Sequence, residues 1–315
     1  MYDNLEIFIT TYNRAEMFGQ TLKTICEQNA EGFDIIILDN ASTDNTKKVF
    51  NEIKKQYPNR HMKFVGAEKN LGHLGNVLRT IQMASREWAM IFHDDDLMHP
   101  EYIKTAMDLI NKTPDAVMAS CTYLPYEHPN DKNWENFSND AYFADIKDFA
   151  ALMFGFILHN FASTIYKTEL LKKNELDNEL YGKISDRPYL LDIAKHGKNV
   201  ILKAPYIRYR THPGQDTNTS ETGPFEKEWF ALLKKYKEIL GNSWFDKYGI
   251  IYNSFVHSQL KLGYHWLKSV NSKMTLKTFK KHAADNDVIR KIEVFKIVEK
   301  IYKLSEAVCK RVMYS

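Results

Sequence analysis

Short apolar runs alternate with amphipathic stretches along the first 125 residues of the chain. Runs rich in β-branched and aromatic residues predict five strands, at 5–12, 33–39, 62–68, 87–93 and 116–124. Apolar residues three or four positions apart predict the intervening helices, at 15–28, 44–57, 75–85 and from about residue 100. This alternation predicts the α/β class, with a mostly parallel sheet flanked by helices and right-handed crossovers.

The pattern loosens after residue 125. It predicts a polar, aromatic-rich loop over 126–160, a strand at 159–166, a helix at 185–197, two strands within 199–212, and helices from 223 to the end. We therefore expect a domain over 1–220, made of the halves 1–125 and 126–220, followed by a helical C-terminal region over 221–315.

Composition excludes several classes of protein. Hydrophobic residues make up 44% of the 315 residues, which is enough for a core and argues against a disordered chain. No apolar run approaches the roughly 20 residues that span a bilayer, and the start lacks a secretory signal pattern. The three cysteines are odd in number and scattered, which argues against a disulfide scaffold or zinc ribbon and favours a reducing compartment. We expect a cytoplasmic protein.

Charge is distributed unevenly. Residues 1–125 carry a net charge of −4 and the remainder carries +7, for a total of +3. We expect the acidic half to bind a cation or sugar hydroxyls and the basic half to face something anionic. The total is too small to indicate nucleic acid as a partner.

Ligands of open parallel sheets bind beyond the carboxyl ends of the strands. That rule singles out four segments, Thr10–Arg14, Asp39–Asp44, Asn70–Asn76 and His93–Asp96. Two nucleotide-binding motifs are absent from the sequence. It contains no GxxxxGK[ST] phosphate loop, and its close glycine pair lacks the third glycine of a dinucleotide fingerprint.

Three consecutive carboxylates, Asp94, Asp95 and Asp96, follow the fourth predicted strand. Adjacent carboxylates repel one another, and a divalent cation is a common remedy. The alternative is a structural role, because acidic residues at the start of a helix complement the helix dipole. The apolar strand before them and the acidic sign of this half favour the metal site.

Four motifs, in this order, carry a family resemblance: ITTYNR (9–14), LDNASTDNT (38–46), NLGHLGN (70–76) and HDDDLMHP (93–100). Together they resemble the nucleotide-sugar-binding half of a family 2 glycosyltransferase of the GT-A fold. The resemblance extends over roughly residues 4–215. It implies that 1–125 binds a nucleotide sugar, UDP-linked in our interpretation, and that 126–220 supplies the acceptor and catalytic half.

The resemblance implies roles for residues at the strand ends. Thr10, Tyr12 and Asn13 would frame the base and ribose of the donor. Asp39 would hydrogen-bond the pyrimidine ring, with Ser42 in the loop after it. Helix capping is the alternative role for Ser42 and its neighbour Asp44. Two further residues would line the ribose and phosphate side, Asn70 and Asn76.

Asp94 and Asp96 resemble the family's Asp-x-Asp motif, in which one acid meets the ribose and the last holds a metal on the diphosphate. Many members carry Asp at the position of His93. This departure leaves open how donor and metal binding are divided among Asp94, Asp95 and Asp96. The resemblance implies Mn²⁺ or Mg²⁺ as cofactor.

The second half would complete the site. Residues 181–202 resemble the segment in which an acid opens a helix and acts as catalytic base, here Asp186; capping of that helix by Ser185 and Asp186 is the alternative. Residues 208–220 resemble the loop that folds over the donor, with His212 as third metal ligand or as an ordinary surface histidine. Neutral imidazole suits Mn²⁺.

A cation beside the leaving diphosphate and a separate carboxylate beside the acceptor hydroxyl suffice for single displacement with inversion. We therefore expect an inverting glycosyltransferase acting on a glycan, lipid-linked glycan or glycoprotein, with no nucleic-acid partner. One alternative is a sugar-nucleotide nucleotidyltransferase, which normally has a glycine-rich basic loop where this chain offers only Arg14. The other is a non-catalytic sugar- or partner-binding protein. Such a protein is expected to have lost the acid cluster or the base, whereas both positions hold acids here.

Two further regions carry expectations. Trp134, Phe137 and Tyr142 would border the acceptor, whereas Phe149 and Phe154, at helical spacing, would pack in the core. Residues 277–311 hold ten basic and five acidic residues with a mostly apolar helical face. We expect that stretch to pack on the protein or a second subunit. The alternative is peripheral contact with an anionic membrane.

Overall fold

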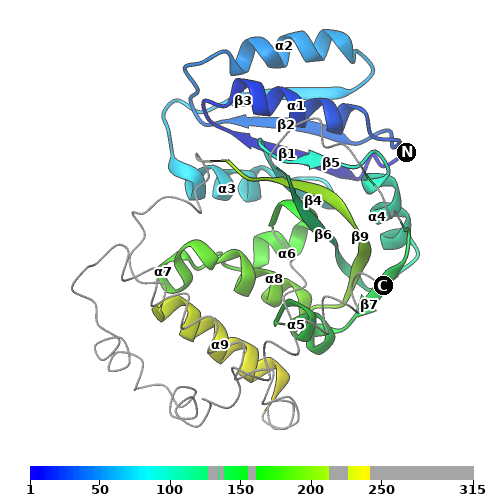
Figure 1. The fold of residues 1–315 in the computed structure, drawn as a ribbon, viewed down its shortest axis with the longest axis vertical. Coiled ribbons are helices and arrows are strands. Elements are labelled where there is room, and N and C mark those ends of the chain that lie inside the picture. The colour runs from blue at the N-terminus through cyan, green and yellow to red at the C-terminus, as the bar shows by residue number, and fades with distance from the viewer. Residues whose placement is uncertain (127–133, 135–137, 155–160, 213–225, 242–315) are drawn as a thin grey trace, which may run out of the picture. The chain divides into compact units, whose positions relative to one another are not determined.

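The computed structural model describes residues 1–126, 134, 138–154, 161–212 and 226–241. The chain forms two compact units (Figure 1). The first comprises Met1–Leu176 and Asp186–Gln215, and the second comprises Asp177–Ser185 and Asp216–Ser315. Every strand of the described residues, and every site residue expected from the sequence, belongs to the first unit.

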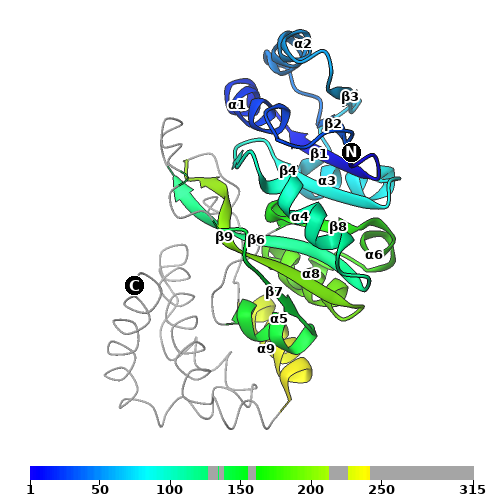
Figure 2. The ribbon, with the colours of Figure 1, turned by 90° about the vertical axis from the view of Figure 1, so that its right-hand side faces the viewer.

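Four parallel strands form one side of the sheet, in the order β3-β2-β1-β4. They are β1 (Leu5–Thr11), β2 (Asp34–Asp39), β3 (His61–Gly66) and β4 (Trp88–His93). The helices between them are α1 (Ala15–Cys26), α2 (Thr46–Gln56) and α3 (Gly72–Met83). Figure 2 shows α1 and α3 on opposite faces of these strands. Every residue of β1 is buried, as expected for a central strand covered on both faces. The sequence-based prediction of these elements is confirmed.

The rest of the sheet has mixed strand directions. Its strands are β5 (Leu97–Met98), β6 (Ala116–Tyr126), β7 (Ala141–Ala144), β8 (Thr164–Lys167) and β9 (Lys198–Arg210). Strand β8 lies between β4 and β6, antiparallel to both, while β9 runs parallel to β6 and antiparallel to β5 and β7. Helices of this part are α4 (Tyr102–Asn111), α5 (Ile146–Phe154), the 3₁₀ turn η1 (Phe161–Ser163), α6 (Thr168–Lys173) and α8 (Asp186–Ala194). The mixed α/β architecture confirms the predicted fold class.

Two sequence predictions for this part are wrong. Residues 199–212 contain one strand, β9, which stays paired with β6 through register shifts on either side of the Thr122–Pro205 pair. Such irregularities accommodate a proline, which has no N–H for the ladder. The stretch 126–160 is not all loop, because β7 and α5 form within it. Phe149 of α5 is fully buried, as predicted, whereas Phe137 and the side chain of Phe154 lie outside the described residues.

The described part of the second unit is helical. It contains α7 (Asn178–Tyr181), the 3₁₀ turn η2 (Gly182–Ile184) and α9 (Glu226–Leu240). Helix α7 packs on α9, where the Lys235 ammonium lies 5.9 Å from the Tyr181 ring centre. The predicted amphipathic stretch 277–311 lies outside the described residues. Within the described part of the chain, no helix is both long and apolar enough to traverse a bilayer.

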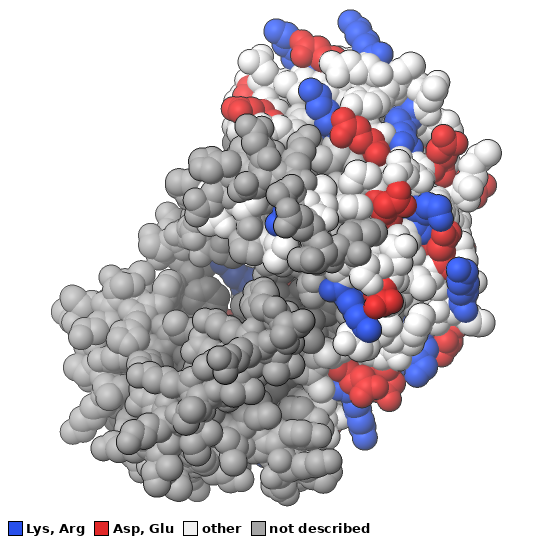
Figure 3. Space-filling model, turned by 45° about the vertical axis from the view of Figure 1, so that its right-hand side comes forward, with Lys and Arg blue, Asp and Glu red and all other residues white. Residues whose placement is uncertain are grey.

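Acidic and basic side chains are interspersed on the described surface that Figure 3 shows. Mixed charge of this kind keeps local potentials small and gives no continuous basic track for a nucleic-acid backbone on this face. The charges that point to a function are therefore the buried carboxylates Asp94, Asp95 and Asp96 at the edge of the sheet.

Candidate active site

The strand register brings the predicted segments together at one edge of the sheet. Thr10 of β1 pairs with His93 of β4, and Thr11 pairs with Asp39 of β2. Because all three strands are parallel, their carboxyl ends open on the same edge. The acid run Asp94–Asp96 follows directly from β4.

Asp94 and Asp95 are buried and share one counter-ion. The Arg14 guanidinium lies 3.1 Å from Oδ1 of Asp94 and 3.0 Å from Oδ2 of Asp95. The backbone N–H of Tyr12 also points at Asp94, at 3.4 Å. On the other side, His212 Nε2 lies 3.0 Å from Oδ2 of Asp95. The structure therefore brings His212 to the acid run, and its role as a metal ligand stays a prediction.

Asp96 is fully buried and only half satisfied. Its Oδ1 accepts the backbone N–H of Arg210 at 3.0 Å, whereas its Oδ2 has no hydrogen-bond partner among the described residues. Burial, followed by the charge of Asp95, raises the pKa of Asp96 well above its ordinary value. A buried carboxylate oxygen with no donor costs free energy unless a ligand or proton meets it.

The two neighbouring acids titrate in opposite directions. Burial and the charge of Asp95 raise the pKa of Asp94 to about 6, although Arg14 opposes the shift. Burial also acts to raise the pKa of Asp95, but His93, His212 and Arg14 together outweigh it and lower that pKa. The pKa of Asp95 is thus lowered by the side chains around it, while burial raises the pKa values of Asp94 and Asp96.

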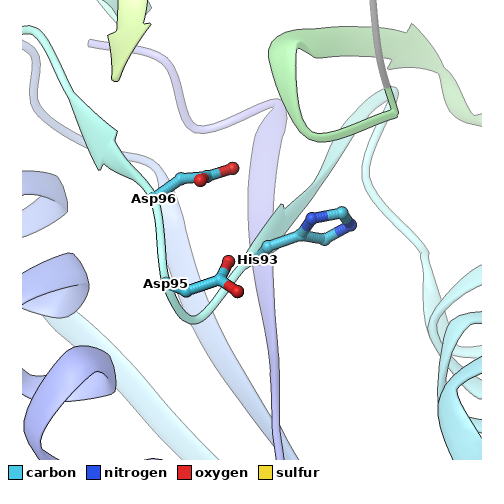
Figure 4. A group of neighbouring side chains, drawn as sticks. All are labelled: His93, Asp95 and Asp96. Carbon is cyan, nitrogen blue, oxygen red and sulfur yellow. The ribbon is translucent and has the colours of Figure 1, made fainter. Parts of the chain in front are cut away.

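A candidate metal group combines two acids of this run with His93, the last residue of β4 (Figure 4). His93, Asp95 and Asp96 each offer one ligand atom, and these atoms lie within 4.8 Å of one another. Burial lowers the pKa of His93, which keeps its imidazole neutral and able to bind a metal. Two carboxylates and one imidazole suit Mn²⁺, and the Oδ2 of Asp96, which has no partner among the residues that the structure describes, is an available ligand. The sequence had indicated Asp94, Asp96 and His212 instead; His93 was noted only as a departure from the family pattern.

The loops after β1 and β2 are fastened to each other. Ser42 Oγ accepts the Asn13 N–H at 2.9 Å, and Asn13 Oδ1 accepts the Thr43 N–H at 2.7 Å. Asn13 and Ala41 have positive φ values, 51° and 64°, which hold both turns in a tight conformation. Next to them the Asp39 carboxylate accepts the Ser42 N–H, at 3.1 Å to the nearer oxygen. Asp39, Ser42 and Asn13 are therefore close together, as the predicted nucleotide site requires.

Asp44 has the helix-capping role offered as its alternative. Its carboxylate accepts the N–H of Ala15 at the start of α1 and the N–H of Thr46 at the start of α2, each at 2.9 Å. Ser42 differs, because its hydroxyl is bound to the Asn13 loop and not to a helix start.

The asparagines of the third motif have different surroundings. Asn70 Oδ1 accepts from the Asn40 side chain and from the Gly72 N–H, both at 2.8 Å, so it shapes the loop before α3. Asn76 is buried and donates to the Leu38 carbonyl at 2.9 Å, while its own oxygen has no partner among the described residues. Asn70 therefore borders the Asp39 loop, and Asn76 lies beneath β2.

Asp186 is the first residue of α8 and is half-buried. Burial raises its pKa, although Arg187, the backbone N–H groups at the helix start and His93 lower it. His93, at the end of β4, is thus among the groups that act on the pKa of Asp186. Tyr123 of β6 connects the same groups, because burial, Asp186 and Asp96 all raise its pKa, with Arg187 opposing. The capping contact and a base role are compatible for this carboxylate.

Sequence reasoning missed several residues that hold the site. Arg210 donates from Nε to the Asp95 carbonyl at 2.8 Å and to the Tyr126 hydroxyl at 2.8 Å. Tyr123 packs its ring on Tyr209, with ring centres 5.0 Å apart. Arg14, Tyr209 and Arg210 lay inside segments that carried the resemblance, but no spacing in the sequence indicates which groups they meet.

Of the expected acceptor aromatics, Trp134 lies between β6 and β7 and Tyr142 lies on β7. Trp134 stacks under the Arg208 guanidinium at 5.1 Å and edge-on against His99. Tyr142 is half-exposed on β7, with the Lys203 ammonium 4.6 Å from its ring centre. Their role at the acceptor stays a prediction.

Sequence comparison connects the chain with enzymes that transfer sugars. The 27% identical GalNAc(5)-diNAcBac-PP-undecaprenol beta-1,3-glucosyltransferase of Campylobacter jejuni aligns over 181 residues, 56% of each chain. The dTDP-rhamnosyl transferase RfbG of Shigella flexneri is 30% identical over 108 residues, 32% of this chain and 36% of its own. The chain thus spans about half or less of the length of these relatives.

Solved structures share the fold. S. aureus TarS in complex with UDP-GlcNAc superposes with a TM-score of 0.61 over 87% of this chain and 76% of its own, at 16% identity. The mannosyltransferase PcManGT from Pyrobaculum calidifontis, in complex with GDP-Man and Mn²⁺, gives 0.54 over 96% and 87%, at 15% identity. The sheet and its helices therefore have the GT-A fold. The family described as glycosyl transferase family 2 matches residues 6–172, more than half of the chain, and the protein belongs to that family.

Proposed function

We propose that this protein transfers a sugar from a nucleoside diphosphate sugar to a hydroxyl of a glycan or glycoconjugate, with inversion at the anomeric carbon. The observation that carries the proposal is the buried acid run at the end of β4, in which Asp96 has a carboxylate oxygen without a partner among the described residues. A transferase of this kind needs a group that stabilises the leaving diphosphate and a separate carboxylate at the acceptor.

The donor would bind along the edge formed by the loops after β1 and β2. In our proposal Thr10, Tyr12, Asn13, Asp39 and Ser42 surround the base and ribose. The Asn13–Ser42 contact and the Asp39–Ser42 contact support one continuous pocket wall. We propose UDP as the nucleotide, in line with the UDP-GlcNAc complex of the similar TarS structure. The PcManGT complex holds GDP-Man, so the base is part of the test.

We propose Mn²⁺ or Mg²⁺ as cofactor, held by Asp96 with Asp95 and His93, and with Asp94 and His212 beside them. When bound there, the cation would neutralise the negative charge that develops on the diphosphate. The protein's own part is to hold the carboxylates in place. Arg210 fixes one oxygen of Asp96, and Tyr126 donates to the Asp95 carbonyl at 3.2 Å.

We propose Asp186 as the general base that accepts the proton of the attacking hydroxyl at its carboxylate. Its pKa is raised by burial, which makes the carboxylate a stronger base than an exposed aspartate. Tyr123, whose pKa Asp186 helps to raise, pairs its ring with that of Tyr209, and paired rings suit the C–H face of a sugar.

We propose a lipid-linked glycan as the acceptor class. The Campylobacter relative carries an undecaprenol-linked glycan in its name, and the basic 277–311 stretch would attract anionic lipid. The alternative is that this stretch packs on the protein or a second copy. Loss of sedimentation with anionic vesicles at low salt, in a variant ending near residue 275, supports the membrane contact. Indifference of the full chain to those vesicles contradicts it.

The transfer itself is tested with a panel of nucleotide sugars in the presence of Mn²⁺ or Mg²⁺. Release of nucleoside diphosphate, dependent on the cation and on Asp186, is the expected result. Release of pyrophosphate from a sugar phosphate and a nucleoside triphosphate indicates a nucleotidyltransferase. Tight binding without release from any donor indicates a non-catalytic sugar-binding protein.

A further inference from the structure

Arg14 is the side chain that pairs directly with two of the three acids. Its Nη1 lies 3.1 Å from Asp94 and 3.0 Å from Asp95, so one nitrogen bridges both carboxylates. The Arg14 side chain is 26% exposed, against 5% and 9% for the two acids. The Arg14 guanidinium therefore lies on the solvent side of Asp94 and Asp95.

A second arginine next to the acid run, Arg210, forms a different set of hydrogen bonds. The Arg210 guanidinium donates to neutral oxygens of Asp95, Tyr126 and Gln20, at 2.8, 2.8 and 2.6 Å. It acts as a brace for the loop. Arg14 instead contacts carboxylate oxygens, including the Oδ2 of Asp95 that also meets His212.

Two kinds of cation can therefore bind the Asp95 carboxylate. It belongs to the group of His93, Asp95 and Asp96 that can hold a metal, and it also carries the Arg14 ion pair. A divalent cation and a guanidinium close to the same carboxylate repel each other, strongly where little water screens them. Binding of one must weaken binding of the other.

We propose, on the basis of the function proposed above, that Arg14 is an exchangeable counter-ion. It occupies Asp94 and Asp95 and suppresses binding of a divalent cation by itself, and it moves to the donor diphosphate when cation and donor bind together. In the sequence, Arg14 directly follows Tyr12 and Asn13, which would frame the nucleotide. Its planar fork suits a phosphate as well as a carboxylate.

The test measures binding of Mn²⁺ alone, by calorimetry or by the spin-resonance signal of free Mn²⁺, in the full chain. Arg14→Met should bind Mn²⁺ about tenfold or more tightly than the wild type, because one repelling charge is gone. Arg14→Gln provides the same test if the first variant folds poorly. Arg14→Lys retains the charge and should bind Mn²⁺ as weakly as the wild type.

A matched control removes an arginine from an ion pair elsewhere. Arg86 contacts Asp34 at 2.7 Å at the opposite end of the strands, so Arg86→Met should leave Mn²⁺ binding unchanged. Binding of UDP with Mn²⁺ present forms the second readout. It should weaken about tenfold in Arg14→Met, since the guanidinium no longer meets the diphosphate.

Unchanged or weaker Mn²⁺ binding by both Arg14→Met and Arg14→Gln overturns the exchange, as does absence of Mn²⁺ binding at millimolar concentration in those variants. The proposed transfer reaction stands or falls separately. It is judged by UDP binding and donor turnover in the wild type, which do not depend on the Arg14 variants.

Discussion

Two buried carboxylates at opposite ends of the β1–β4 strand pair differ in how far their hydrogen-bonding capacity is satisfied. Glu6, near the start of β1, is 2% exposed and accepts the backbone N–H groups of Ser85 and Arg86, the latter at 2.8 Å. Asp96, beyond the end of β4, is fully buried and leaves one oxygen without a partner among the described residues.

The difference separates a structural acid from one available to a ligand. Backbone donors at fixed positions satisfy Glu6 and connect the start of β1 to the segment before β4. The Oδ2 of Asp96 accepts no hydrogen bond from the described residues, so its burial lowers the stability of the fold unless a ligand or proton binds it. Folding alone does not explain why three acids are buried side by side.

The largest effect is expected from Asp96→Asn. The amide retains an oxygen for the Arg210 N–H but loses the charge, so transfer should fall by about 10³-fold or more. The melting temperature should hold or rise, because a buried charge is removed. Steady-state donor turnover and thermal melting are the measurements. An active variant, or full wild-type turnover in excess EDTA, contradicts the metal role.

The second change is Asp186→Asn, which retains the shape of the side chain and removes the base. Turnover should fall by about 10²–10⁴-fold, with donor affinity largely kept. Turnover at saturating donor and donor affinity by calorimetry separate the two effects. Loss of donor binding with turnover retained would make Asp186 a donor contact, with the base elsewhere.

Glu6→Ala addresses the opposite end of the strands. It removes the acceptor of the Ser85 and Arg86 N–H groups, which should lower the free energy of unfolding by about 1–2 kcal/mol. Turnover per folded molecule should not change. Glu6→Gln, which retains an acceptor oxygen, should recover much of the loss. Denaturant unfolding and turnover of the same samples check both statements.

The smallest expected effect is a dependence of stability on pH. Because burial raises the pKa of Asp186 in the folded protein, that residue stabilises the fold below its unfolded pKa of about 4 and loses this contribution as pH rises through the folded pKa. Asp186→Asn should therefore melt slightly higher than wild type at pH 7, and the gap should close near pH 4. A constant gap across that range contradicts the shift.

The parallel strands could be predicted from the sequence because their signal is local. β1, β2 and β4 are continuous apolar runs followed by polar strand ends, and their parallel pairing brings Asp39 and the acid run to one edge. The resemblance of the four motifs then assigned the donor-side residues.

The remaining features depend on contacts distant in sequence. β5 has only two residues and exists because Leu97 and Met98 pair with β9. The place of β8 between β4 and β6 is a choice of partners that periodicity does not reveal. Arg14 lies 80 positions before Asp94, and only the folded loops bring the two together.

The fastening of the loops after β1 and β2 has a consequence for sequence variation. Asn13 is bonded to Ser42 and Thr43, and Asp44 holds the starts of both α1 and α2. A substitution at one partner leaves the other's donor or acceptor unmatched, so double-mutant cycles between the loops should show non-additive energies. Neither loop can be transplanted alone, and a redesign of nucleotide preference would have to exchange both as one cassette.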